Sequence, residues 1–98
     1  MTAADQFLNT TTHRFVEAVD QHRARIDGRG HLTEQAADLI RGAVEMLCRS
    51  GHRRITLDLH AVEAADDEAV AALRSLALLV RARHGELVVL SDTWGESP

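Results

Sequence analysis

Residues 55–73, ITLDLHAVEAADDEAVAAL, join a strand pattern to a helix pattern through three consecutive acidic residues. Apolar and polar residues alternate over positions 55–59, which is typical of a strand with one buried face. After the acids, apolar residues recur at helical spacing, and we predict a helix that starts at Asp66 or Asp67 and ends near residue 84. The acidic cluster therefore lies where a strand passes into a helix, the usual ligand-binding end of a parallel α/β sheet.

A second amphipathic helix is predicted earlier in the chain, over residues 33–49. Thr33 is suited to cap its start and Gly51 to end it, and Gly85 is suited to close the later helix. Each helix has a stripe of apolar residues that we expect to face the core: Ala36, Leu39, Ile40, Ala43, Met46 and Leu47 on the first, and Val70, Leu73, Leu76, Ala77 and Val80 on the second.

The remaining ordered segments predict strands. Residues 13–19 (HRFVEAV) favour a strand with helix as an open alternative, and residues 22–27 (HRARID) a strand that ends in a tight turn at DGRG. Residues 86–90 (ELVVL) form a nearly continuous apolar run after Glu86, as in a strand within a sheet. The order strand, strand, helix, strand, helix, strand indicates an α/β domain: a small mixed sheet of about four strands with two helices mainly on one face. We assign residues 13–91 to this domain, 1–12 to a flexible lead-in and 92–98 to a loose tail.

Composition limits the possible functions. The chain of 98 residues suffices for one domain, and only 3% of its residues are aromatic, so Ala, Leu, Val and Ile must build the core. A net charge of −4 without a basic run gives no nucleic-acid footprint, and no apolar stretch is long enough to span a membrane. The single Cys48 excludes an internal disulfide and fits a reducing compartment, so we expect a cytoplasmic protein.

The acidic cluster has a structural interpretation beside any functional one. Acids in the first turn of a helix cap free N–H groups and complement the helix dipole. Metal binding is not predicted, because the cluster lacks the alternating carboxylates and the glycine of a calcium loop, and the six histidines show no ligand spacing. Catalysis is not predicted either, because it needs a cleft and an orienting partner. His60, which follows the strand residues 53–59, is the one histidine expected to face the acidic cluster.

Residues 22–90 resemble the STAS domain, the fold of bacterial anti-sigma factor antagonists. The most specific segments are ITLDLHAVEAAD at 55–66 and ARHGELVVL at 82–90. The resemblance implies a non-catalytic regulator without a cofactor, whose partner is an anti-sigma factor that is also a serine kinase. It also implies a final helix that the residues after 90 do not predict. The edge that such a helix covers would then be open to a partner or to a second copy in a homodimer.

The chain departs from the family at the site of regulation. The family motif Asp-Ser-Ser-Gly-Leu corresponds to Asp66, Asp67, Glu68, Ala69 and Val70, so a carboxylate replaces the serine that the partner kinase phosphorylates. Phosphate on that serine releases the antagonist, and Glu68 has the same sign of charge as a phosphoserine without accepting phosphate. We therefore expect residues 66–70 and His60 to bind a partner, with Glu68 as a phosphomimetic. Two other functions of such domains remain open: a subunit of a lipid-transport ABC complex and a nucleotide-sensing module.

Overall fold

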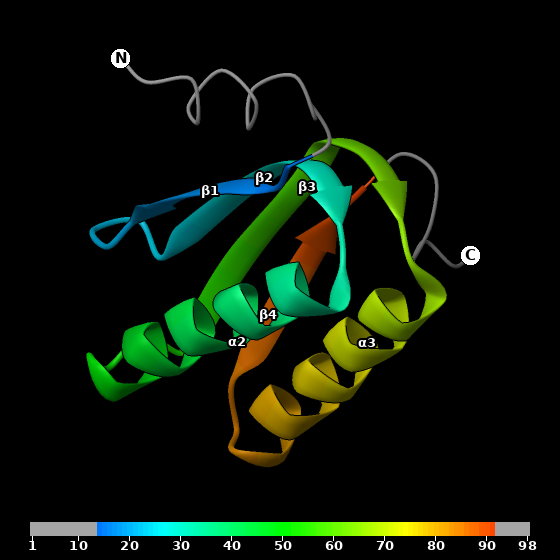
Figure 1. Cartoon of the computed structure of the whole chain (residues 1–98). Coiled ribbons are helices and arrows are strands. Elements are labelled where there is room, and N and C mark those ends of the chain that lie inside the picture. Colours follow the sequence, from blue (N-terminus) through cyan, green and yellow to red (C-terminus); the bar gives the residue numbers. More distant parts are fainter. Residues whose placement is uncertain (1–13, 92–98) are drawn as a thin grey trace.

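The computed structural model describes residues 14–91 (Figure 1). The predicted lead-in at residues 1–12 and tail at 92–98 lie outside the described residues. Along the chain, the elements are β1 (Val16–Asp20), β2 (Arg25–Leu32), α2 (Glu34–Arg49), β3 (Arg54–Ala65), α3 (Asp67–Ala82) and β4 (Glu86–Leu90). The predicted order is therefore confirmed, and the ambiguous segment at 13–19 contributes a strand rather than a helix.

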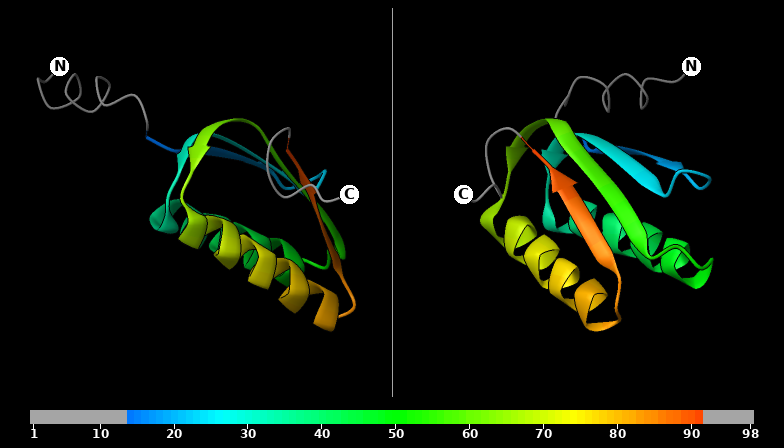
Figure 2. Two further views of the ribbon diagram at one scale, coloured as in Figure 1. Left: turned by 90° about the vertical axis from the view of Figure 1, so that its right-hand side faces the viewer. Right: turned by 180° about the vertical axis from the view of Figure 1, so that it is seen from behind.

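The four strands form one mixed sheet in the order β1-β2-β3-β4. Strand β1 runs antiparallel to β2, while β2, β3 and β4 are parallel to one another. Helices α2 and α3 lie side by side on the same face of the sheet (Figure 2). Because the parallel strands all point the same way, both helices begin at the carboxyl edge of the sheet. The predicted fold class, a small mixed sheet with two helices on one face, is confirmed.

The core fills the space between the sheet and the two helices. Alternate residues of β3 point into it, and Ile55, Leu57 and Leu59 are fully buried, as the alternation predicted. The buried side chains are all aliphatic: Ala, Val, Leu and Ile residues from both layers. Such small side chains allow the helices to pack closely on the sheet, and the partly buried ring of Phe15 packs against this core next to Gly28.

The buried face of α2 differs from the predicted stripe. Leu39 was expected to face the core, yet 57% of it is exposed. The buried arc is centred on Ile40 and Leu47 and extends to Ala37 and Val44. The helix is therefore turned toward that side, where it contacts both the sheet and α3, and Leu39 falls beyond the edge of the buried arc.

The glycines of DGRG do not form the predicted turn. Strand β2 continues through them to Leu32, and the chain turns before it, at residues 21–24. A side chain at Gly28 would clash with the ring of Phe15. Gly30 has a φ of +100° next to the carbonyl of Arg14, at one of two irregularities in the pairing of β2 with β3. Gly28 is needed for the close approach of Phe15, and Gly30 for the bulge. In a sequence, glycines with these two uses look the same as glycines of a turn.

The two helices end in the same way. In each, the two N–H groups after the C-cap residue bond back to carbonyls of the last turn, with Gly51 and His84 in the left-handed conformation. Gly51 was correctly predicted to end α2. Helix α3 was predicted to reach residue 84 with Gly85 as its terminator, but it ends at Ala82 and His84 takes the left-handed position. Gly85 instead lies against the carbonyl of Arg53, where a side chain does not fit.

Candidate functional site

The acidic cluster lies at the carboxyl edge of the sheet, where β3 passes into α3 (Figure 1). Strand β3 continues to Ala65 because its pairing with β2 extends as far as Leu32. Asp66 alone separates the strand from the helix, and its N–H donates to the carbonyl of Leu32 at 2.9 Å. Residues 64–70 therefore form a strand end, one N-cap residue and the first helical turn.

Asp66 occupies the N-cap position of α3, but its side chain does not cap the helix. Its carbonyl accepts from the N–H of Val70 at 3.0 Å, so the backbone has the usual N-cap geometry. The carboxylate oxygen Oδ1 lies instead 2.8 Å from Nε2 of His31, on the neighbouring strand β2. Asp67, the other predicted cap, is the first residue of the helix itself. The carboxylate expected to cap α3 thus links two elements of the fold.

The next four residues differ in their exposure. Asp67 and Glu68 are exposed in the first turn of α3, where their negative charges interact favourably with the positive end of the helix dipole. Ala69 is fully buried in the core, so its side chain is not available to a partner, contrary to our expectation for it. Val70 is half-buried. The two exposed carboxylates lie at one end of the sheet, as the sequence predicted. Ala69, which follows them, packs in the core below the helix.

A shallow hollow of about 450 Å³ lies beside this helix start. Val70 and Ala71 form part of its apolar lining, and Glu63, Asp67 and Arg74 bring charges to it. The hollow is completed by the last residues of β3: Val62, Ala64 and Ala65. A small apolar side chain of a partner fits such a hollow, with cationic groups against the carboxylates.

Glu63 and Arg74 were not predicted from the sequence as residues of this site. The signal for Arg74 was available, because residues 67, 70, 71 and 74 follow the three- and four-residue spacing of one helix face. Glu63 gave no comparable signal, since the extension of β3 past residue 59 depends on its pairing with β2.

His60 lies inside β3, and the expectation that it follows the strand is wrong. Its ring Nδ1 is 2.8 Å from Oδ1 of Asp58, and its backbone N–H donates to the same oxygen at 3.0 Å. Arg25 of β2 binds the other oxygen of Asp58. The N–H of His60, and then its ring and Arg25, hold the pKa of the Asp58 carboxylate below the ordinary value of 3.8. His60 thus belongs to a charge network centred on Asp58.

Two further classes of site are absent from residues 14–91. No group of three or more His, Cys, Asp or Glu residues in this part of the chain is placed to hold a metal ion. None of the described helices has the length and apolar character required to cross a membrane. The chemistry of the described carboxyl edge is therefore that of carboxylates beside a small apolar hollow.

No family model and no curated relative matches this chain. Among solved structures, it is similar to the anti-sigma factor antagonist SpoIIAA in its unphosphorylated form, with a TM-score of 0.58 and 19% sequence identity. The similarity covers 87% of this chain and 76% of the other. At this identity the comparison shows the fold, and the mixed four-stranded sheet with its two helices agrees with it. The chain therefore has the STAS-like α/β fold of that antagonist.

Proposed function

We propose that this chain is a non-catalytic regulatory domain that binds a protein partner at the acidic start of α3. The partner is an anti-sigma factor of the serine-kinase class, and phosphorylation at position 68 does not switch the contact. The shared fold with an anti-sigma factor antagonist supports the regulatory class. The replacement of the family's phosphorylated serine by Glu68 supports the absence of that switch, because a carboxylate cannot accept phosphate.

The observation that carries the proposal is the exposure of Glu68 in the first turn of α3, the turn from which Asp67 lines the hollow. Were Glu68 buried or tied into an ion pair, a structural role would suffice to explain it. No ion pair to Glu68 is formed by the described residues. Its charge is therefore presented to solvent at the position where the resemblance places the regulated residue.

The surface next to Glu68 has the character of a protein interface. Several small and apolar residues of α3 remain exposed, some toward α2 and some toward β4, and they give a partner apolar contacts beyond the acidic end: Ala71, Ala72, Leu78 and Leu79. Leu78 is 63% exposed, unusual for so large an apolar side chain in a helix with a well-packed inner face. Exposed apolar area bordered by charge is typical of partner-binding surfaces.

The test is affinity capture from an extract of the source cells, with identification of the retained proteins by mass spectrometry. Four baits are compared: the native chain, Glu68→Ser, Ala71→Arg and Glu34→Ser. Glu34 is the matched control, because it is likewise an acid in the first turn of a helix, on α2. We expect capture of an anti-sigma factor kinase by at least one of the native and Glu68→Ser baits, and its loss with Ala71→Arg, which places a charged side chain in the hollow.

The pattern of capture also separates the alternatives. Capture of the kinase by Glu68→Ser alone indicates that Glu68 imitates the phosphorylated, released state. Equal capture by the native chain, Glu68→Ser and Glu34→Ser indicates a partner that is bound permanently. The proposal fails if no anti-sigma factor kinase is retained by any bait, or if the native chain captures the kinase and Ala71→Arg captures it equally well. Retention of a transport ATPase would favour the ABC-complex function.

A further inference from the structure

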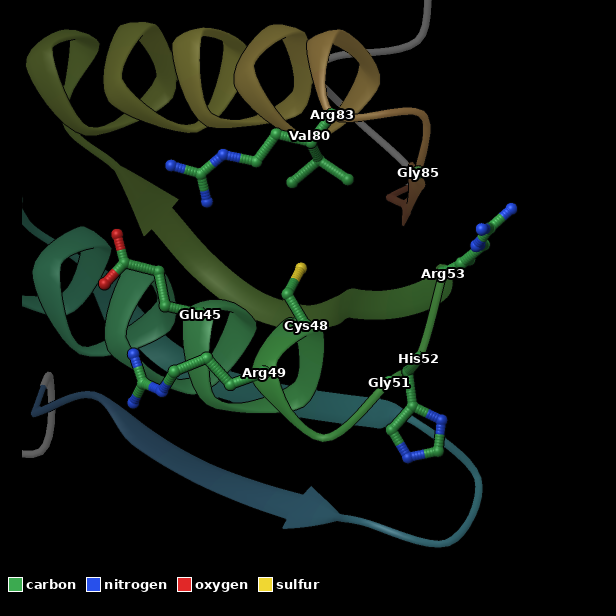
Figure 3. Close-up of a pocket in the computed structure, with 9 residues that line it drawn as sticks. All are labelled: Glu45, Cys48, Arg49, Gly51, His52, Arg53, Val80, Arg83 and Gly85. Atoms are coloured by element: carbon green, nitrogen blue, oxygen red, sulfur yellow. The ribbon is translucent and has the colours of Figure 1, made fainter.

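The end of the molecule opposite the acidic cluster has a second, larger hollow of about 720 Å³ (Figure 3). It lies between the C-terminal ends of α2 and α3 and the turn that leads into β3. Buried Val80 and half-buried Cys48 contribute apolar surface to its wall. Three exposed arginines surround it: Arg49, Arg53 and Arg83.

None of the described acidic residues neutralises these guanidinium groups. Within residues 14–91, Arg49, Arg53 and Arg83 take part in no ion pair. Nε of the nearby Arg54 lies 3.7 Å from Oε1 of Glu86, so this acid already has an arginine partner. Glu45 is the one acidic residue among the described residues that line the hollow. A chain of net charge −4 thus has a strongly basic end.

The ends of the helices explain only part of this charge. Arg49 lies in the last turn of α2 and Arg83 is the C-cap residue of α3, where a cation complements the negative end of the helix dipole. Arg53 belongs to neither helix. Figure 3 shows Arg83 and Glu45 extending into the space between α2 and α3, whereas Arg53 points outward. The cations are therefore spread around the hollow instead of converging on one point.

We infer that this basic end binds an acidic segment of a partner protein. Arginine forms paired hydrogen bonds with carboxylates, and side chains spread around an open hollow match carboxylates spaced along a peptide better than one small anion. The apolar wall at Val80 and Cys48 accommodates an aliphatic part of the same segment. Nucleic acid fits less well: His52 is the one ring among the described residues that line the hollow, and the acidic end of the molecule repels a long polyanion.

The experiment measures the binding of fluorescein-labelled hexaglutamate to the full chain by fluorescence anisotropy, with hexaglutamine as the uncharged control. We expect hexaglutamate to bind at about 50 mM NaCl and to bind more weakly at about 200 mM, because salt screens exposed charges. Reversing two charges in Arg53→Glu/Arg83→Glu should weaken binding by about tenfold or more. Arg41→Glu is the matched control, since this exposed arginine lies on α2 about 12 Å along the helix from Arg49.

The inference is overturned if hexaglutamate and hexaglutamine bind alike, or if Arg41→Glu weakens binding as much as the double variant. Tighter binding of a single-stranded hexanucleotide than of hexaglutamate would also overturn it, in favour of nucleic acid. Backbone amide chemical shifts of the native chain give a readout that does not depend on a variant. We expect the shifts caused by hexaglutamate to lie in residues 45–54 and 80–86, and shifts confined to other residues would contradict the inference. Because the acidic start of α3 is not involved, failure here leaves the proposed function untouched.

Discussion

Helices α2 and α3 begin at the same edge of the sheet, but their N-cap residues use their side chains differently. Thr33 caps α2, with its hydroxyl accepting from the N–H of Ala36 at 3.1 Å. Asp66 has the same position on α3 and makes no such bond, because its carboxylate contacts His31. One side chain therefore stabilises its own helix, while the other ties the helix to a neighbouring strand. The comparison shows that a residue such as Asp66, of a type that commonly caps helices, can use its side chain for a tertiary contact instead.

The difference also bears on function. The N–H groups in the first turn of a helix have no acceptor within the helix, and in α2 the hydroxyl of Thr33 accepts from one of them. In α3, the first turn has no side-chain cap from its N-cap residue, and its exposed carboxylates Asp67 and Glu68 face solvent. Helix α2 therefore begins with a side-chain cap, whereas α3 begins with two exposed carboxylates, where we propose that a partner binds.

The largest effect on stability is expected from a substitution in β2, the strand that leads into α2. In Gly30→Ala, the new Cβ would lie 2.2 Å from the carbonyl oxygen of Arg14, at a φ of +100°. We expect the free energy of unfolding to fall by about 2 kcal/mol or more, measured by urea unfolding followed by circular dichroism. Gly42→Ala is the control: nothing lies within 4 Å of its Cβ, and we expect a gain of about 0.5–1 kcal/mol. Equal stability of the two variants would refute this account of Gly30.

Removing the cap of α2 should have the next largest effect. Thr33→Ala is expected to lower the free energy of unfolding by about 1 kcal/mol, because the N–H of Ala36 loses its acceptor. Thr33→Ser keeps a hydroxyl at the same position and should keep most of the stability. Thermal and urea unfolding of both variants measure the difference. A loss in Thr33→Ser as large as in Thr33→Ala would show that the methyl group, not the cap, stabilises the helix start.

Asp66→Ala should be less destabilising than Thr33→Ala, although Asp is the better cap by composition. No capping bond is lost, and the contact with His31 is partly exposed to solvent, so we expect a loss of about 0.2–1 kcal/mol. A double-mutant cycle with His31→Ala should assign most of this loss to the pair. If Asp66→Ala is as destabilising in the His31→Ala background as in the native chain, the carboxylate caps α3 after all.

Asp58 sharpens the comparison, because its carboxylate does accept a backbone N–H, that of His60. Its pKa lies below 3.8, so its charge stabilises the fold above that pH, and this contribution is lost as the pH falls through the lower folded-state pKa. We expect Asp58→Asn to have the smallest effect of the four, since the amide oxygen remains an acceptor. The difference in unfolding free energy from the native chain should be present at neutral pH and should shrink below about pH 4. A difference that does not vary with pH would show that the charge contributes nothing.

Much of the fold followed from periodicity. The alternation over residues 55–59 and the helical spacing of both amphipathic segments depend only on local geometry, and the structure confirms the strand, the helices and the order of the elements. Errors arose where one residue type has several uses. Gly28 and Gly30 were interpreted as a turn, and Leu39 as a core residue, because spacing alone does not say how far the buried arc of a helix extends.

By itself, the sequence determined the class of the fold and the position of the carboxylates, Glu68 among them, at the start of the second helix. These features depend on spacing and residue identity along a continuous stretch. Only the tertiary structure decided that Asp66 contacts His31, that His60 contacts Asp58 within a strand, and that arginines from both helix ends and a turn surround one hollow. The physical reason is that partners far apart in the chain meet through strand register and helix packing, which local spacing does not encode.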